Sequence, residues 1–427
     1  MPPDNLQHMT STPTTTSQKH ANHRNTLLLA LALSLGAAVS LGVTRFAYGL
    51  LLPTMRADLG WSYTLAGAMN TANALGYLLG ALATPRLMQR FGAARLLLWG
   101  AGLASAFMGL SGFFTEATPL LVQRLLAGVA SAFVFIAGGL LAARLAATEP
   151  QRSGFLLGLY YGGTGFGIVL SALLVPAVLQ AAQQEPHGWA WAWWALALAC
   201  VLGTAVLAWP VRVLAGRPAV AAAASVQTGG DQTSAVSTLV AGRIFVWRDF
   251  AFALAGYTLF GVGYIGYMTF VIALLREQGA SASSVTLFYA LLGVAVLLSA
   301  RLWAGLLDRF KGGQALACLC ALLGLATVLP ALTSAWGVVL ASGLLFGGVF
   351  LSVVASTTAL VRHNLPQSAW AAGISAFTVV FAAGQIVGPT IVGLIADGPG
   401  GLARGLVFSA VALWLGAVLA WKQQPIA

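Results

Sequence analysis

Apolar stretches long enough to cross a bilayer recur along the whole chain, separated by short breaks that contain Pro, Gly or charged residues. A membrane-spanning helix needs about 20 predominantly apolar residues. Only 7% of the 427 residues are charged, against roughly 25% in soluble domains. The sequence therefore predicts an all-α integral membrane protein. We expect twelve membrane-spanning helices, at residues 26–53, 64–85, 95–114, 118–144, 153–179, 189–210, 249–275, 283–306, 313–332, 335–361, 368–396 and 402–421.

The basic residues predict the orientation of the chain, because loops rich in Arg and Lys stay on the cytoplasmic side of a membrane. In the twelve-helix arrangement Arg56, Arg276 and Arg404 fall on one side. The other side receives Lys19, Arg24, Arg86, Arg90, Arg95, Arg144, Arg152, Arg212, Arg217, Arg243, Arg248, Arg309, Lys311, Arg362 and Lys422. We therefore expect a multi-pass membrane protein with both termini in the cytoplasm. The net charge of +11 reflects this asymmetry, so the expected partner is anionic membrane lipid and not nucleic acid.

Three segments outside the predicted helices are polar or low in complexity. Residues 1–25 are rich in Ser, Thr and His and lack a basic segment that leads into a short apolar one, which favours a disordered cytoplasmic tail over a signal peptide. Residues 211–248 are typical of a flexible cytoplasmic linker, and 422–427 form a second short tail. The linker divides six predicted helices, in residues 26–210, from six in residues 249–421.

The two groups of six helices share a pattern at a constant offset. Gly42 and Tyr48 recur 219 residues later as Gly261 and Tyr267, and "QRFG" recurs at the same offset as "DRFK". One duplication explains these matches. Parallel repeats of this kind are a known transporter plan with the substrate site between the repeats. The pattern predicts two six-helix bundles related by a pseudo-two-fold axis.

Several motifs at these positions resemble the major facilitator superfamily (MFS), over nearly the whole chain after the tail. "AGLLDRFKGG" is similar to the basic loop between the second and third helices of each half, which implies that Asp308 and Arg309 hold a cytoplasmic gate. In the first half the loop is "ATPRLMQRFGAAR", where Gln89 replaces the usual Asp and Arg90 follows it. "LVQRLLAGVASA" resembles the superfamily's fourth helix through its arginine, Arg124.

Two further stretches narrow the resemblance. "GLYYGGTGFG" looks like the fifth-helix glycine motif of antiporters, with Gly163 where that motif has its proline. "TRFAYGLLLPTM", followed by "GWS", resembles the bacterial branch called YbfB/YjiJ-like. The resemblance implies the MFS fold and a place in the bacterial inner membrane. It also implies secondary transport of a small-molecule substrate, by a monomer that needs no cofactor.

Arg45 and Arg124 lie well inside predicted helices, where an unpaired charge costs at least roughly 2.5–3.5 kcal/mol on insertion scales. At 1.5 Å per residue, Arg45 lies about 12 Å from Pro53 and Arg124 about 8 Å from Pro119, which places both in the periplasmic half of the membrane. No Asp or Glu of the sequence falls at mid-membrane. The resemblance puts the first and fourth helices at the central cavity, so two cations without a carboxylate predict a bound anion, which a guanidinium grips with two hydrogen bonds.

Structural roles for both arginines stay open. The resemblance also allows Arg124 to bond backbone carbonyls of the first helix, and Arg45 is close enough to the periplasmic interface to snorkel towards it. Polar and aromatic residues at helical spacing accompany the two arginines, although each tyrosine is equally suited to packing and each amide to helix contacts. The predicted substrate-binding residues are Arg45, Tyr48, Asn70, Asn73, Tyr77, Arg124, Tyr264, Tyr267 and Gln385.

The favoured function is secondary active transport of a small organic anion by alternating access, in which the ligand shifts the population between two states. Asp58 and Glu116 are the candidates for coupling to protons, because a carboxylate folded back towards Arg45 would release it on protonation. A counter-anion or uniport fits as well. The alternative is a proton-coupled drug or metabolite exporter, with both arginines structural and an apolar pocket formed by Phe46, Phe133, Phe135, Tyr264 and Phe377.

Enzymatic and metal chemistry find no support in the sequence. The five His residues fall in tails or near helix ends without metal-ligand or triad spacing. Cys200, Cys318 and Cys320 lie inside predicted helices, as small packing residues do. Phosphate-binding and nucleophile motifs are missing. We expect no enzymatic activity, no cofactor and no metal site.

Overall fold

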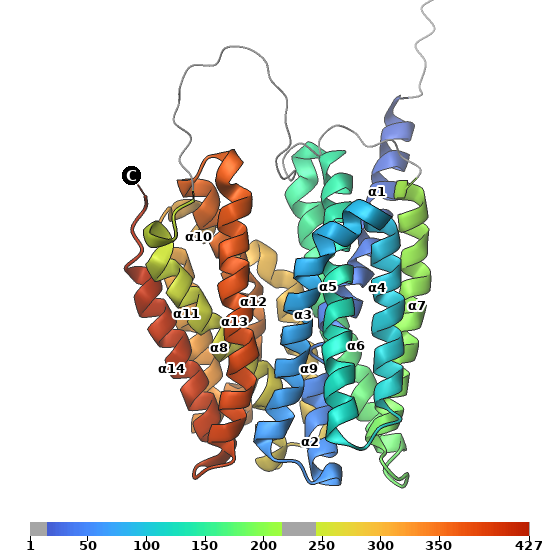
Figure 1. Cartoon of the computed structure of the whole chain (residues 1–427), viewed down its shortest axis with the longest axis vertical. Helices are drawn as coiled ribbons and strands as arrows, with labels where there is room; N and C mark the ends of the chain where they lie inside the picture. The colour runs from blue at the N-terminus through green and yellow to red at the C-terminus, as the bar shows by residue number, and fades with distance from the viewer. Residues whose placement is uncertain (1–14, 216–244, 427) are drawn as a thin grey trace, which may run out of the picture.

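Two helical bundles lie side by side in the computed structural model, which describes residues 15–215 and 245–426 (Figure 1). The N-terminal bundle comprises α1 (Thr15–Ala37), the π-helical segment η1 (Ala38–Val43), α2 (Tyr48–Leu59), α3 (Tyr63–Phe91), α4 (Ala93–Ser111), α5 (Ala117–Ala147), α6 (Ser153–Ala181) and α7 (Trp189–Ala215). The C-terminal bundle comprises α8 (Ala251–Glu277), α9 (Ala282–Leu302), α10 (Ala304–Arg309), α11 (Gln314–Leu332), α12 (Trp336–Asn364), α13 (Trp370–Ala396) and α14 (Gly401–Trp421). Short 3-10 turns precede α6, α8 and α13, at Pro150–Arg152, Trp247–Phe250 and Gln367–Ala369.

The described chain crosses the membrane twelve times, as the sequence predicts. Eleven of its spans are long and apolar enough by themselves, and α1, η1 and α2 together form the first. The remaining crossing is α3, a helix of 29 residues that runs along the N-terminal bundle (Figure 1). Its polar residues Asn70, Thr71 and Asn73 lower its hydropathy. The all-α membrane fold of two six-helix halves is confirmed.

The beginning of α1 and the end of α14 lie at the same end of the molecule, the upper end in Figure 1. We call this end the terminal face and the other end the opposite face. Arg56, Arg276 and Arg404 belong to the opposite face, because they lie at the end of α2, the end of α8 and the start of α14. These three arginines therefore lie at the opposite end of the molecule from the other basic connections.

The first helix begins earlier than predicted. A disordered tail is expected over residues 1–25, but α1 is helical from Thr15, and residues 1–14 lie outside the described chain. The physical reason is that residues 15–25 contain neither Pro nor Gly, the two residues that interrupt helices most strongly. The first helix therefore begins on the N-terminal side of the predicted membrane-spanning segment, 26–53.

The described helices also shorten the linker that is expected at 211–248. The helix α7 continues to Ala215, after which the sequence supplies Gly216 and Pro218, both typical of the end of a helix. The middle of the expected linker, residues 216–244, lies outside the described chain.

The predicted helix at 283–306 is interrupted as well. The helix α9 ends at Leu302, and Trp303 separates it from α10. The indole Nε1 of Trp303 donates to the Gly348 carbonyl at 2.8 Å, so a side chain anchored to α12 occupies this break.

The first crossing is not the regular helix expected at 26–53. The Thr44 N–H bonds the Val39 carbonyl five residues earlier at 3.1 Å, and the Phe46 N–H bonds Leu41 in the same way. Such wide turns are frequent at functional sites and leave backbone carbonyls available to other partners. The interruption places Arg45 between η1 and α2.

Close backbone contact fixes the interrupted segment against the fifth crossing. A Cβ at Gly42 would lie 2.6 Å from the Cα of Gly167 on α6, so only glycine permits this approach. The π-helical η1 therefore packs directly on α6.

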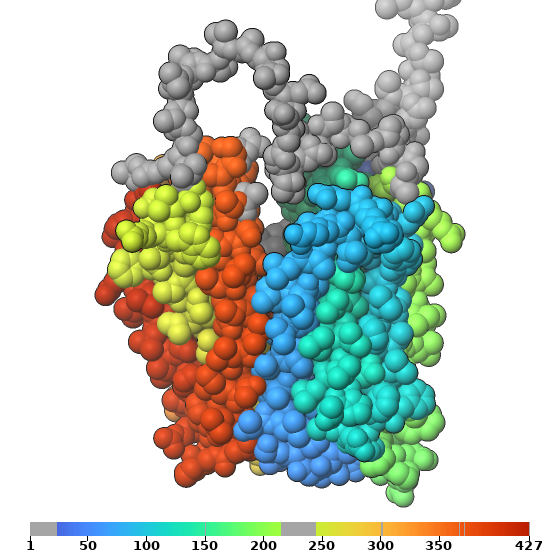
Figure 2. All heavy atoms as spheres, in the orientation of Figure 1, coloured from blue at the N-terminus to red at the C-terminus, as the bar shows by residue number. Residues whose placement is uncertain are grey.

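The two halves are joined mainly between mid-membrane and the opposite face. Contacts run along α3 with α13 and α6 with α9. The described hydrogen bonds between the halves involve Arg45, Phe46, Tyr63, Thr64, Asn70 and Thr71 of the N-terminal half. In Figure 2 the halves touch over the lower part of the view, and a hollow separates them near the terminal face. The described molecule is thus sealed at the opposite face.

Candidate functional site

Arg45 is buried at the interrupted first crossing, with 4% of its surface exposed. Its Nη2 donates to Oε1 of Gln385 on α13 in the other half, and its guanidinium lies 5.9 Å from the ring centroid of Tyr77. A guanidinium has five N–H donors, and Gln385 is the acceptor described for Arg45. Arg45 therefore keeps donors without a described acceptor beside a neutral partner.

Gln385 connects Arg45 to an aromatic wall. Its Oε1 also accepts from the Tyr264 hydroxyl at 2.6 Å. The Tyr264 ring stacks on Phe260, with ring centroids 4.9 Å apart, and on Phe381 at 5.5 Å. Tyr264 is the residue that the repeat pairs with Arg45, and the structure brings the two together on one amide oxygen.

Arg124 is buried as deeply, with 3% of its surface exposed, but has a different set of partners. Its Nη1 donates to the Thr44 carbonyl at 2.8 Å and its Nη2 to Oδ1 of Asn70 at 2.9 Å. The guanidinium also lies 4.9 Å from the centroid of the Tyr48 ring, and its Nε is buried without a described acceptor. The contact with Thr44 is the one that the structural interpretation of Arg124 predicts, because the break in the first crossing exposes this carbonyl.

Asn70 extends this network to the other half. Its Nδ2 donates to Oγ1 of Thr269 on α8 at 2.7 Å, and Thr269 donates to the Ile265 carbonyl. Asn73, one turn further along α3, donates to the Arg124 carbonyl at 3.1 Å. Both amides satisfy helix backbones or neighbouring side chains.

The two tyrosines that the repeat aligns, Tyr48 and Tyr267, are packing residues in this structure. The Tyr48 hydroxyl donates to the Ala66 carbonyl at 2.9 Å. The Tyr267 hydroxyl lies 2.7 Å from Ser342 Oγ, and its ring stacks on Phe346 with centroids 4.1 Å apart. Their polar atoms are used within their own halves, so neither supports the predicted contact with substrate.

Tyr289 on α9 is a site residue that the sequence reasoning missed. Its hydroxyl donates across the interface to the Phe46 carbonyl at 2.8 Å, one residue from Arg45. The offset of 219 residues pairs Tyr289 with Asn70, and Asn70 makes the corresponding contact from α3 to α8. The repeat was the signal that would have found it.

Asp397 seals the opposite face from the C-terminal half. Its carboxylate accepts from the Tyr63 N–H at 2.7 Å, the Thr64 N–H at 2.8 Å and the Thr64 hydroxyl at 2.6 Å, at the start of α3. The Tyr63 hydroxyl also donates to Glu277, and the Arg56 guanidinium lies 3.7 Å from the Tyr63 ring centroid. Burial raises the pKa of Asp397. The hydrogen bonds from Thr64 and Tyr63 and the charge of Arg56 together lower it by more than burial raises it, so the pKa lies below its usual range.

The expected gate residues Gln89, Arg90, Asp308 and Arg309 are all exposed at the terminal face. The guanidinium of Arg90 lies over Phe91 and that of Arg309 over Phe310. Within the described chain no ion pair joins these four residues. The described chain therefore shows no contact among the four residues of the gate that the resemblance implies.

The expected coupling carboxylates do not approach Arg45. The Asp58 carboxylate lies 2.6 Å from His187 Nδ1 and accepts from Trp189 Nε1 at 2.5 Å, so it binds the connection before α7. Glu116 is exposed at the start of α5. The idea that Asp58 folds back onto Arg45 is wrong for this conformation, because His187 and Trp189 hold it at the opposite face.

The aromatic residues of the alternative exporter pocket pack on one another. Phe46 meets Phe350 edge to face at 5.9 Å, and Phe377 packs on Tyr257 at 5.7 Å. Phe135 belongs to another group, with its ring 5.5 Å from Tyr161. The expected pocket residues therefore belong to separate aromatic clusters, in which the rings pack against one another.

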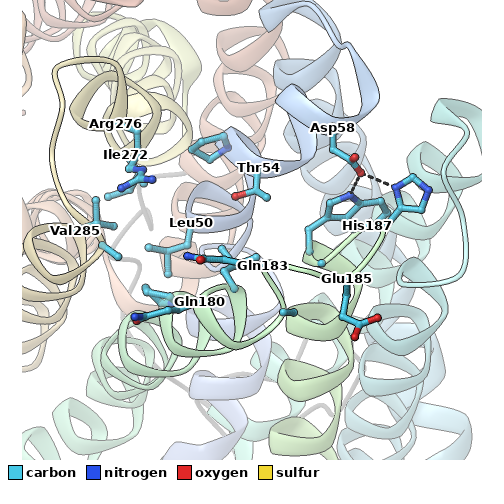
Figure 3. Close-up of a pocket in the computed structure, with 17 residues that line it drawn as sticks. Leu50, Thr54, Asp58, Gln180, Gln183, Glu185, His187, Ile272, Arg276 and Val285 are labelled. Atoms are coloured by element: carbon cyan, nitrogen blue, oxygen red, sulfur yellow. Dashed lines mark hydrogen bonds and ion pairs between the residues drawn. The ribbon is translucent and has the colours of Figure 1, made fainter.

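A cavity of about 380 Å³ opens at the opposite face between the halves (Figure 3). The N-terminal half contributes Thr54, Asp58 and Glu185, and the C-terminal half contributes Ile272 and Arg276. Of the residues predicted to act in transport, only Asp58 lines it.

A family model described as "Uncharacterised MFS-type transporter YbfB" matches residues 37–421, from the interrupted first crossing to the end of α14. The chain belongs to this family. The resemblance seen in the sequence motifs is thereby confirmed, and the protein is an MFS-type secondary transporter that works by alternating access between its two halves. No curated relative matches the sequence.

Solved structures of transporters share the fold of this MFS protein. A bacterial homologue of the human lysosomal transporter Spinster, in an inward-facing and unoccupied conformation, superposes with a TM-score of 0.66 at 16% identity, over 93% of this chain and 96% of that one. The nucleoside transporter NupG gives a TM-score of 0.65 at 13% identity, over 94% of this chain and 100% of that one. At such identities the likeness establishes the fold alone.

Proposed function

We propose that the transporter carries a small organic anion and that Arg45 binds its anionic group. The observation that carries this proposal is that Arg45 is buried against a neutral amide, Gln385, and has further donors without a described acceptor. Every Asp and Glu of the described chain lies at a helix end or in a connection. A carboxylate or phosphate would supply a negative charge and paired acceptor oxygens, which Gln385 cannot.

The position of Gln385 connects anion binding to movement of the halves. Arg45 belongs to the N-terminal half and Gln385 to the C-terminal half, so their hydrogen bond crosses the interface. An anion that binds the Arg45 guanidinium displaces the Gln385 amide oxygen and so removes this hydrogen bond between the halves. Binding then changes the relative stability of the two states, as alternating access requires.

The orientation of the basic connections supports the terminal face as the cytoplasmic one. With this orientation the described conformation is inward-facing, in the inner membrane of a bacterium, with both termini in the cytoplasm. The exposed gate residues Asp308 and Arg309 fit an open cytoplasmic side.

Anion exchange or uniport fits the site better than proton coupling. Asp58 and Glu116, the carboxylates considered for protons, lie at the opposite face. A group that titrates with the substrate has to sense Arg45 at close range, because charges interact strongly only over short distances. A counter-anion can use Arg45 itself.

A second candidate, export of an apolar drug or metabolite, is favoured by the aromatic cluster around Tyr264, Phe350 and Phe381. Stacked rings of this kind bind planar apolar molecules when they open. Such an exporter would use Arg45 and Arg124 as structural residues only.

Ligand-induced thermal stabilisation distinguishes the two functions. The purified protein and its Arg45→Gln variant are heated with a panel of organic anions, neutral metabolites and lipophilic cations. We expect an anion to raise the melting temperature of the wild type in a concentration-dependent way and to leave Arg45→Gln unchanged. Equal stabilisation of both proteins, or a response to apolar compounds alone, would favour the exporter.

A further inference from the structure

Tyr77 on α3 differs from the other tyrosines of the molecule, all of which lie in the described chain. Each of the others has a described hydrogen bond from its hydroxyl, a ring packed on another aromatic ring, or both. Within the same described residues Tyr77 has neither. The group described beside its ring is Arg45, whose guanidinium carbon lies 5.9 Å from the ring centroid.

The Arg45 guanidinium does not pack closely on the Tyr77 ring. A cation–π contact extends to about 6 Å from the ring centroid, and the distance of 5.9 Å is near that limit. At the opposite face the Arg56 guanidinium lies only 3.7 Å from the centroid of Tyr63 and covers that ring. The Tyr77 side chain is half-buried. Its ring is therefore available to a further partner next to Arg45.

The exposed part of Tyr77 faces the interior of the transporter and not the lipid. Its hydroxyl interacts electrostatically with Arg45, with Tyr161 on α6 and with Tyr264 on α8. These partners belong to the first crossing, to another helix of the same half and to the other half. A molecule bound to Arg45 between the halves therefore lies next to the Tyr77 ring.

The distance between Arg45 and Tyr77 fits an anion whose charged group is bonded directly to an aromatic ring. Hydrogen bonds of about 2.7–2.9 Å to a carboxylate place such a ring on the order of 6–7 Å from the guanidinium carbon. The Tyr77 centroid lies 5.9 Å from the same carbon. Aromatic rings pack with their centroids about 4.5–7 Å apart. One small molecule can therefore hold its carboxylate on Arg45 and its ring against Tyr77.

We propose that the transported anion is an aryl carboxylate, with its carboxylate on Arg45 and its ring packed on the ring of Tyr77. This substrate class rests on the proposed function, because it needs the anion at Arg45. Tyr77 then determines specificity: it distinguishes an aromatic ring from a saturated one of the same size, while Arg45 binds the charge of either.

Benzoate and cyclohexanecarboxylate are the matched probes. Each carries one carboxylate on a six-membered ring and is ionised at neutral pH, so Arg45 by itself does not distinguish them. The saturated ring is at least as apolar as the aromatic one, so burial by itself does not favour benzoate. The half-saturating concentration of each compound is measured from the rise in melting temperature of the purified full chain.

We expect benzoate to bind the wild type roughly threefold to tenfold more tightly than cyclohexanecarboxylate, the range for one pair of packed rings. Tyr77→Phe should keep this preference and Tyr77→Leu should abolish it. Binding of cyclohexanecarboxylate by both variants shows that the site is intact, and the comparison of the two probes on the wild type needs no variant. Tyr161→Leu is the matched control. The Tyr161 ring already packs on Phe135 at 5.5 Å, so its loss should leave the preference unchanged.

Arg45→Gln separates the failure of this inference from the failure of the proposed function. If anions bind through Arg45 but the wild type does not prefer benzoate, the substrate class is wrong and the anion site stands. If benzoate binds Arg45→Gln as tightly as the wild type, the anion site is wrong and the substrate class falls with it. A preference for benzoate that persists in Tyr77→Leu would overturn the role of Tyr77.

Discussion

Arg45 and Arg124 are two buried arginines of the same half, with 4% and 3% of their surfaces exposed, and they have opposite kinds of surroundings. Arg124 is held within its own half by the Thr44 carbonyl and by Asn70. Arg45 reaches across the interface to one neutral amide oxygen, on Gln385. Burial and charge therefore do not distinguish Arg45, the proposed binding residue, from Arg124. The difference lies in whether the fold has already supplied the acceptors.

Removing Arg124 should produce the largest loss of stability. Arg124→Leu leaves the Thr44 carbonyl and Asn70 Oδ1 without their donor, and two buried acceptors at about 1–3 kcal/mol each predict a loss of roughly 2–6 kcal/mol. The measurement is thermal unfolding of the purified protein. The matched control is Arg45→Leu, which should cost less because Gln385 keeps Tyr264 as a donor. Equal losses in the two variants would remove the distinction.

Arg45→Lys tests whether Arg45 acts through its fork of donors or through charge alone. Lysine keeps the charge but cannot form the paired hydrogen bonds of a guanidinium. We expect the affinity for the anion found in the stabilisation panel to fall roughly tenfold, or about 1.4 kcal/mol, with a small change in melting temperature in its absence. Anion titrations of both proteins check this. Unchanged affinity in Arg45→Lys would mean that long-range charge is sufficient.

Gln385→Glu should give Arg45 a strong acceptor within the protein, as Arg124 already has. The new carboxylate replaces a neutral acceptor with an ionised one, which can accept two parallel hydrogen bonds from the guanidinium. We expect the ligand-free protein to melt at a higher temperature and the response to anions to disappear. Gln385→Ala is the control: it removes the competing acceptor and should leave the anion response in place. If Gln385→Glu still responds to anions, the substrate does not displace Gln385.

The pH dependence of the seal at Asp397 should give the smallest effect, because the contact is exposed. The pKa of Asp397 is lowered in the sealed conformation, so the contact contributes fully above the usual pKa of about 3.9. Its contribution is lost as the pH falls through the lowered pKa. The melting temperature of Asp397→Asn should therefore depend less on pH than that of the wild type below about pH 4. Identical pH profiles would show that this carboxylate does not stabilise the sealed face.

Much of the fold was predictable because it follows from length and hydropathy. Helix positions agree with the prediction within a few residues for most crossings. Two errors fall where backbone geometry departs from a regular helix, at η1 and at Trp303, and two more at helix ends, where α1 begins earlier and α7 ends later than predicted. The pattern of apolar residues does not report a π-turn, since the same residues remain apolar on either side of it. What accompanies the π-turn is a tertiary contact, the close packing of Gly42 against α6.

The site was predictable only in part. The sequence predicted that Arg45, Tyr264 and Gln385 belong to one site, and the structure joins Arg45 and Tyr264 through Gln385. It placed Tyr48 and Tyr267 with them, but these hydroxyls find partners within their own halves. Position along a helix gives the depth of a side chain. It does not give which neighbouring helix the side chain meets.

By itself the sequence determined that the chain crosses the membrane twelve times, in two related halves, with two arginines at a depth that offers no carboxylate. These properties depend on hydropathy, on the repeat and on residue counting, all of which are local. Only the tertiary structure decided which arginine is already satisfied. The break in the first crossing frees the Thr44 carbonyl for Arg124, while the approach of α13 brings Gln385 to Arg45. Hydrogen bonds act over a few ångströms between residues far apart in the chain, so their partners are fixed by packing.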